Sequence, residues 1–187
     1  MTLQLERRQF SVAEYQRMGE AGILKEDDRV ELIRGEIIAM SPIGSRHMAC
    51  VNRLTGIFSA IPSSLFILSI QNPVHIGKYS EPEPDISLLK YSADFYEDDK
   101  PRSEDVVLVI EVAEFSFDYD VEIKIPLYAE AGIPEVWLID LNENRVIVHT
   151  DPAEGSYQHA VEFRPGEKIC STTLPALIVD ISRIFGL

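Results

Sequence analysis

Residues 106–112, VVLVIEV, and residues 135–141, EVWLIDL, decide the fold that the sequence predicts. Both stretches are apolar almost throughout, which is typical of strands covered on both faces of a sheet. The segment between them, 121–131, reads as a helix because Gly132 and Pro134 then form a stop signal. Strand, helix and strand make a β-α-β unit, so we expect two parallel strands with a right-handed crossover.

Shorter elements extend this unit on both sides. Ser11 and Glu14 have the spacing of a capping box for a helix over 11–21. A further helix is expected over 47–61, ended by 62–64, and another over 178–185. The expected strands are a hairpin over 29–40 with its turn at Arg34-Gly35, then 65–70, 73–77, 86–89, and an antiparallel pair at 145–149 and 157–163. The acidic stretch 91–105 reads as a surface loop. The predicted fold class is α/β (α+β), a mixed sheet flanked by helices.

Length and composition predict one globular domain over residues 1–187, with 45% hydrophobic residues. No run approaches the ~18 to 20 apolar residues of a membrane span, so no membrane partner is expected. Residues 1–10 contain no hydrophobic stretch of a secretory signal, and a cytoplasmic location is expected. Cys50 and Cys170 could form one disulfide, but two free buried thiols are favoured in a reducing compartment.

The charge balance argues against an ordinary nucleic-acid binder. The chain has 31 acidic and 17 basic residues, a net charge of −14. Proteins that bind nucleic acid usually present a basic face. This chain must therefore concentrate its few cations, bind metal ions that offset its carboxylates, or bind another kind of ligand.

Three charged residues stand where a charge needs an explanation. Asp85 follows Pro84 at the start of a strand, and Glu111 ends a buried strand. Lys124 lies in the following helix, where Asp120 and Tyr128, four residues away on either side, share its face.

Hydrolysis of a phosphodiester needs hard oxygen ligands for Mg²⁺ or Mn²⁺ and a cation near the developing negative charge. Asp85, Glu111 and the backbone carbonyl of Val112 could hold the metal ion, which activates water. Lys124 could orient that water or stabilise the transition state. These residues could therefore supply the parts that metal-dependent phosphodiester cleavage requires.

Taken together in order and spacing, several motifs resemble the large bacterial family of putative restriction endonucleases in the PD-(D/E)XK nuclease superfamily. These are VELIRGEI at 30–37, His47, EPDI at 83–86, VIEV at 109–112, Asp120 with Lys124 and Tyr128, and AGIPEVWLID at 131–140. The resemblance implies a restriction-endonuclease-like core, cleavage with a divalent metal, and Asp85 and Glu111 as metal ligands. Glu31, His47, Asp120 and Tyr128 would support them.

The chain also departs from that pattern. Ala113 occupies the superfamily's lysine position, although the family resembled often carries this lysine on the next helix, as Lys124 would. Phe115 and Phe117 are bulky where the family is small and polar. Pro126 suits a helix that begins near Lys124 rather than near Val121.

Each residue also has an interpretation without function. Asp85 could be a turn residue, and Glu111 could reach solvent at its strand end. Lys124 could be an exposed lysine paired with Asp120, and both interpretations stay open. Glu31 could pair with Arg29 or Arg34, and His47 could simply begin a helix.

Two functions from different classes remain. The first is a Mg²⁺-dependent endonuclease that cleaves DNA, as a homodimer if it cuts both strands. The alternative is a catalytically degenerate nuclease fold that binds a protein partner or assembles with itself. The charge of −14 and Ala113 favour the alternative, whereas Asp85, Glu111 and Lys124 together favour the enzyme.

Overall fold

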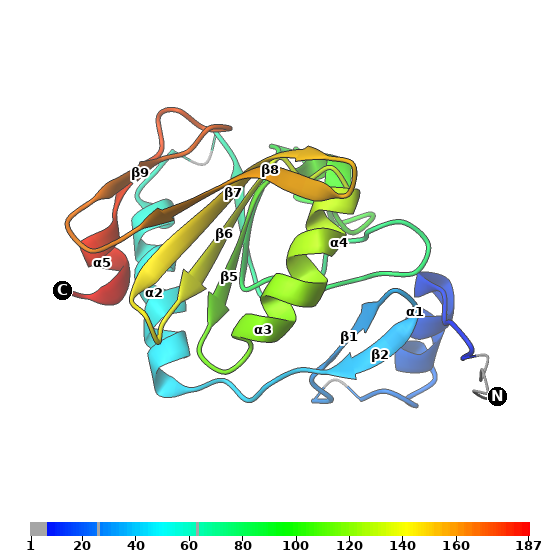
Figure 1. Ribbon diagram of the computed structural model, residues 1–187. Coiled ribbons are helices and arrows are strands. Elements are labelled where there is room, and N and C mark those ends of the chain that lie inside the picture. The colour runs from blue at the N-terminus through cyan, green and yellow to red at the C-terminus, as the bar shows by residue number, and fades with distance from the viewer. Residues whose placement is uncertain (1–6, 26, 63) are drawn as a thin grey trace.

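The centre of the computed structural model, which describes residues 7–25, 27–62 and 64–187, is a six-stranded mixed sheet (Figure 1). Its strands, in spatial order, are β3 (Ile67–Ile70), β4 (Ile86–Leu89), β5 (Val106–Ala113), β6 (Glu135–Asp140), β7 (Arg145–Ala153) and β8 (Ser156–Phe163). β5 and β6 pair in parallel, and the other neighbouring strands pair antiparallel. The predicted mixed sheet and its parallel central pair are therefore confirmed.

Helices cover both faces of this sheet (Figure 1). One face carries α2 (Ser45–Ser59) and α5 (Ile181–Phe185). The other carries a continuous helical segment made of α3 (Phe117–Tyr119), the π-helix η2 (Asp120–Lys124) and α4 (Ile125–Glu130). Successive side chains of a strand point to opposite faces. Ile110 and Val112 accordingly join the core under α2, and Glu111 faces the side of α3, η2 and α4.

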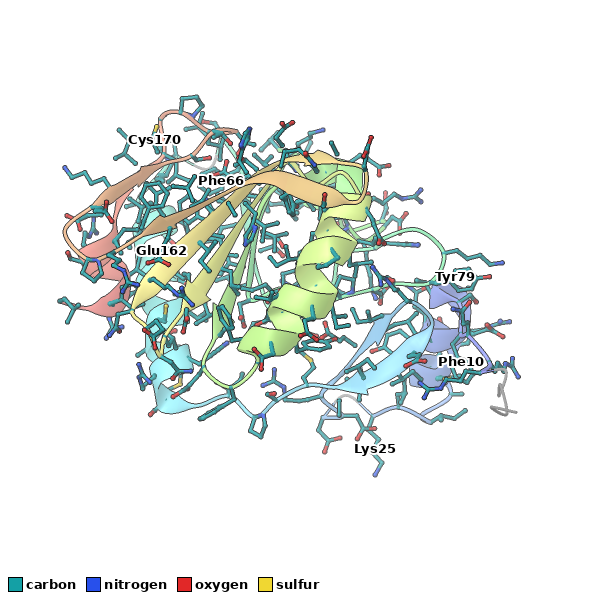
Figure 2. All side chains as sticks on the ribbon, viewed as in Figure 1. Phe10, Lys25, Phe66, Tyr79, Glu162 and Cys170 are labelled. Atoms are coloured by element: carbon teal, nitrogen blue, oxygen red, sulfur yellow. The ribbon has the colours of Figure 1, made fainter. Side chains whose placement is uncertain are left out.

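The N-terminal elements pack at one end of the molecule. There α1 (Val12–Glu20) lies beside the hairpin of β1 (Val30–Ile33) and β2 (Glu36–Ala39), and the Ser11–Glu14 capping box is formed as predicted. Arg34 and Gly35 have φ of 49° and 82°, the pattern of a two-residue hairpin turn. Phe10, Lys25 and Tyr79 mark this end, and Cys170 the opposite end (Figure 2).

Several sequence predictions need correction. Ile178–Asp180 is a strand, β10, paired with β9 (Lys168–Cys170), so only 181–185 of the predicted terminal helix is helical. The strand β10 has only three residues, with an exposed Ile178 and a buried Val179. An alternation this short cannot be distinguished from a helical turn in the sequence. The segment 73–77 contributes isolated bridges rather than a strand, and 103–105 form a 3₁₀ turn, η1 (Ser103–Asp105). Cys170 is exposed, so only Cys50 is a buried thiol.

Pro126 is accommodated by a change of helix type. The helical segment begins at Phe117, earlier than predicted, and its middle turn is π-helical, with the Ile125 N–H donating to the Asp120 carbonyl. The wider turn absorbs the proline, which becomes the second residue of α4. π-turns of this kind occur often at functional sites. Here the turn lies between Asp120 and Lys124, two of the predicted site residues.

Two expectations concern parts of the chain that bear less on the fold. Within the described residues, the helices lack the length and hydrophobicity that a bilayer span requires. The expectation about a secretory signal falls largely on residues 1–6, and Ser63 of the predicted helix stop is also outside the described residues.

Candidate active site

A cavity of about 280 Å³ lies where the end of the sheet, the hairpin, the start of α2 and the π-helix meet. Its charged wall is drawn from segments that are far apart in the sequence. The predicted site residues that line it are Glu31 from β1, His47 from α2, Asp85 before β4, Glu111 and Val112 from β5, and Asp120 and Lys124 from the π-helix. Tyr128 from α4 reaches the same cluster through its hydroxyl group.

Strand register brings Asp85 beside Glu111. Ile86 of β4 pairs with Ile110 of β5, so the next residues outward are Asp85 and Glu111, and both line the cavity. The Val112 N–H donates to Asp85 Oδ2 at 2.9 Å, which fixes the carboxylate against β5. His47 Nε2 lies 3.0 Å from Asp85 Oδ1. Asp85 is thus held by tertiary contacts and is more than a turn residue.

Lys124 is buried, contrary to the interpretation of an exposed helix lysine. Its Nζ lies 3.2 Å from Glu111 Oε1 and 3.3 Å from Glu31 Oε2, and the side chain is 6% exposed. The Tyr128 hydroxyl donates to the same Glu111 oxygen at 2.5 Å. Glu111 is therefore buried rather than at a solvent-exposed strand end, and a cation lies against it.

Glu31 takes part in the cluster instead of pairing with Arg29 or Arg34. Beside Lys124, it accepts hydrogen bonds from the Tyr119 hydroxyl at 3.0 Å and the Glu83 N–H at 3.1 Å. Sequence reasoning missed both of these partners. Their neighbours Asp120 and Asp85 were singled out, and the same short stretches could have drawn attention to Tyr119 and Glu83.

Asp120 does not reach Lys124 by a hydrogen bond in the described residues. Its carboxylate instead accepts a hydrogen bond from Ser116 Oγ at 2.7 Å. Ser116 is a further cavity-lining residue that sequence reasoning did not single out.

Burial sets the electrostatics of the cluster. Loss of water raises the pKa of Glu111 to about 8, which Lys124 opposes and Asp120 and Asp85 reinforce. Burial likewise raises the pKa of Asp120 to about 6. Burial alone would lower the pKa of Lys124, but Glu111, Glu31 and Asp120 outweigh it and keep this pKa above its ordinary value. The site therefore holds a charged lysine among carboxylates that favour an added positive charge.

The donor set suits one hard divalent ion that keeps part of its water shell. No group of three or more His, Cys, Asp or Glu side chains that could hold a metal ion occurs in residues 7–25, 27–62 and 64–187. Mg²⁺ commonly uses one or two carboxylates with water and substrate phosphate, so Asp85, Glu111 and the Val112 carbonyl fit it. His47 Nδ1 and Glu114 Oε2 are also buried at the cavity without hydrogen-bond partners among the described residues.

The surroundings of Ala113 leave little room for a charged side chain at the superfamily's lysine position. Its side chain is fully buried in the core under α4, packed with the group that contains Ile125 and Tyr128. A lysine at this position would have to place its charge within that apolar core. Lys124 instead brings its ammonium group to Glu111 from the helical segment that covers this face of the sheet.

Comparisons with known proteins give the family and the fold of the chain. A family model, Uma2, described as "Putative restriction endonuclease", matches residues 12–182. The chain belongs to the Uma2 family. Its fold is similar to the crystal structure of a putative nuclease belonging to DUF820 from Anabaena variabilis, with a TM-score of 0.73 and 19% identity over 95% of this chain and 98% of that chain. No match was found among curated proteins.

Membership of the Uma2 family confirms the resemblance that the sequence motifs carried, and the structural likeness confirms the restriction-endonuclease-like fold. The family is described as one of nucleases. The roles of the individual site residues, the metal ion and the substrate remain predictions.

Proposed function

We propose that this Uma2 protein is an endonuclease that hydrolyses DNA phosphodiester bonds with Mg²⁺ or Mn²⁺. One observation carries the proposal: Asp85, Glu111 and Lys124, which come from three separate segments of the chain, line the same cavity. The family description supports the same reaction class. Because the pairing of carboxylates with a nearby cation suits phosphodiester hydrolysis, the arrangement favours catalysis over a purely structural role.

Asp85, Glu111 and the Val112 carbonyl would hold the metal ion. When bound, the ion supplies Lewis-acid polarisation of the phosphate and a more acidic water molecule. Lys124 keeps its proton and presents a positive charge where negative charge develops on the phosphate. His47 and Tyr128 hold the carboxylates of Asp85 and Glu111 in place through their contacts.

Assembly of the active protein is part of the same proposal. A single domain that cuts both strands of DNA needs two active sites, so we propose a homodimer for double-strand cleavage. The rival function is a degenerate nuclease fold that binds a protein or itself. The net charge of −14 favours this rival, because it opposes binding of a polyanion.

Plasmid nicking with Mg²⁺ or Mn²⁺ tests the proposal. Asp85→Ala should abolish both nicking and metal binding measured by calorimetry. Lys124→Ala should keep metal binding but lower the nicking rate about 100-fold or more, because it removes charge stabilisation from the transition state. Lys168→Ala changes an exposed lysine of β9, away from the cavity, and serves as the control.

The outcomes separate the two functions. Equal nicking by wild type and Lys124→Ala would remove Lys124 from the reaction. A wild-type protein that cuts no DNA with any divalent ion, while staying folded, would favour the rival binding function.

A further inference from the structure

Phe115 is exposed at the mouth of the candidate active site. It lies in the connection between β5 and α3, lines the cavity, and has 74% of its surface exposed. An isolated exposed apolar side chain is common on protein surfaces. Phe115 is not the cavity's only apolar side chain among the described residues. The cavity is also lined by Ile38, Met40, Pro42 and Ile43.

Phe117, two residues further on, is a phenylalanine with a structural role and serves as a comparison. It is half-buried, packs against the core under α4, and lies 5.5 Å from the Arg145 guanidinium across its ring face. Within the part of the chain that the structure describes, Phe115 has neither an aromatic partner nor a cation over its ring. Packing therefore does not explain Phe115.

The cavity combines two chemistries. The charged part holds Asp85, Glu111 and Lys124, which suit a phosphate group and its metal ion. The apolar part, which includes the exposed ring of Phe115, suits the flat face of a nucleobase, which stacks on aromatic rings. The volume of about 280 Å³ is close to the about 300 Å³ at which small-molecule pockets begin, which is the size range for a single nucleotide.

Charge favours a single strand as well. A duplex carries one negative charge per about 1.7 Å of axis, whereas one strand carries one per about 3.4 Å. The protein has a net charge of −14, and the lysine and arginine side chains among the cavity-lining residues are Lys124 and Arg29. Stacking on Phe115 adds affinity without any need for a cation, so it compensates for the weak electrostatic attraction.

We propose that the cavity binds one unpaired nucleotide of DNA, with its base stacked on Phe115 and its phosphate toward Asp85, Glu111 and Lys124. The protein would then prefer single-stranded or locally unpaired DNA over perfect duplex. This inference rests on the proposed nuclease function for the chemistry at the phosphate. The contact of Phe115 with the base is a matter of binding and can be measured without cleavage.

The test uses a short single-stranded DNA that carries 2-aminopurine, a base whose fluorescence falls on stacking, with Ca²⁺ in place of Mg²⁺ to limit cleavage. Wild type should quench the probe and bind it more tightly than the matching duplex. Phe115→Ala should weaken binding about 5- to 150-fold, the usual range for loss of one stacked base. Phe115→Trp should retain quenching and affinity.

Phe95→Ala is the matched control, because Phe95 is 64% exposed and lies outside the cavity. It should bind as wild type does, and thermal melting should show that both alanine variants are folded. Equal binding of single strand and duplex, or unchanged quenching by Phe115→Ala, would overturn the inference. Tighter binding of RNA of the same sequence would overturn the choice of DNA.

Cleavage with Mg²⁺ or Mn²⁺ on the same variants separates this inference from the proposed function. Metal-dependent nicking that does not depend on Phe115 would leave the nuclease proposal standing and remove the stacking role. Quenching that depends on Phe115, with no cleavage of any DNA, would support base binding and contradict the nuclease proposal.

Discussion

Two buried glutamates on neighbouring strands of the same sheet have opposite surroundings. Glu135, at the start of β6, is fully buried, and Oε2 accepts hydrogen bonds from Ser171, Thr172 and Thr173 side chains and from the backbone N–H groups of the last two. Its Oε1 accepts one from Trp137 Nε1 at 2.7 Å. Glu111, in β5, accepts hydrogen bonds from Lys124 and Tyr128 only on Oε1, among the described residues.

This difference predicts a structural role for Glu135 and a catalytic role for Glu111. The hydrogen bonds around Glu135 fasten the loop 171–173 to the sheet and occupy both of its carboxylate oxygens. Glu111 lines a cavity, and only its Oε1 accepts hydrogen bonds among the described residues, so Oε2 is free for a ligand. Burial also raises the pKa of Glu111 to about 8. Burial of a carboxylate alone therefore does not predict an active site, whereas a buried carboxylate with a free oxygen beside a cavity does.

The largest expected effect comes from replacing each glutamate by its isosteric amide. Glu111→Gln should lower DNA cleavage about 1,000-fold, because it removes a proposed metal ligand. Its free energy of unfolding should change by about 1 kcal/mol or less, since the amide oxygen can still accept from Tyr128. Nicking assays and urea unfolding measure the two quantities.

Glu135→Gln is the matched counterpart and should show the reverse pattern. The amide cannot satisfy all of the donors around it, so the free energy of unfolding should fall by about 2 to 4 kcal/mol. Cleavage per folded molecule should equal that of wild type. A loss of cleavage in Glu135→Gln without loss of stability would contradict the distinction between the two sites.

The pH dependence of stability should reveal the raised pKa of Glu111. The folded pKa values of Glu111 and Asp120, about 8 and about 6, exceed their ordinary values of 4.5 and 3.8. The folded protein therefore holds protons that the unfolded chain releases. Without metal, the contribution of these groups to the free energy of unfolding should decrease as pH rises through these values.

Urea unfolding between about pH 5 and about pH 8 checks the direction of this dependence. Glu111→Gln should flatten the slope above about pH 6, where Asp120 no longer titrates. Mg²⁺ affinity should increase over the same range, because the ion requires the ionised carboxylate. A slope in wild type that Glu111→Gln leaves unchanged would assign the titration to another group.

The smallest expected effects come from single hydroxyl groups at the two sites. Ser171→Ala removes one of the donors to Glu135 and should lower the free energy of unfolding by about 1 kcal/mol without changing cleavage. The hydrogen bond from Ser116 to Asp120 lowers the pKa of Asp120. Ser116→Ala removes this hydrogen bond, so the pKa of Asp120 should rise further. NMR titration of Asp120 and urea unfolding of both variants test this pair. Equal effects on stability and on the Asp120 pKa in both variants would contradict it.

The elements that sequence reasoning identified correctly depend on local pattern. The run VVLVIEV forms a buried strand because apolar β-branched residues suit a sheet covered on both faces. Ser11 and Glu14 cap α1 because both partners lie within one helical turn. The segment 178–180 was read incorrectly because its conformation depends on β9, which lies eight or more residues away.

The sequence by itself determined the central β-α-β unit, the family, and the residue types available for chemistry at Asp85, Glu111 and Lys124. Only the tertiary structure decided which partners surround each buried charge. It joined Glu31 and Tyr119 to the cluster, buried Lys124 through a π-helical turn, and surrounded Glu135 with hydrogen-bond donors from 171–173. The physical reason is that hydrogen bonds and burial depend on groups brought together from distant segments, which local sequence patterns do not specify.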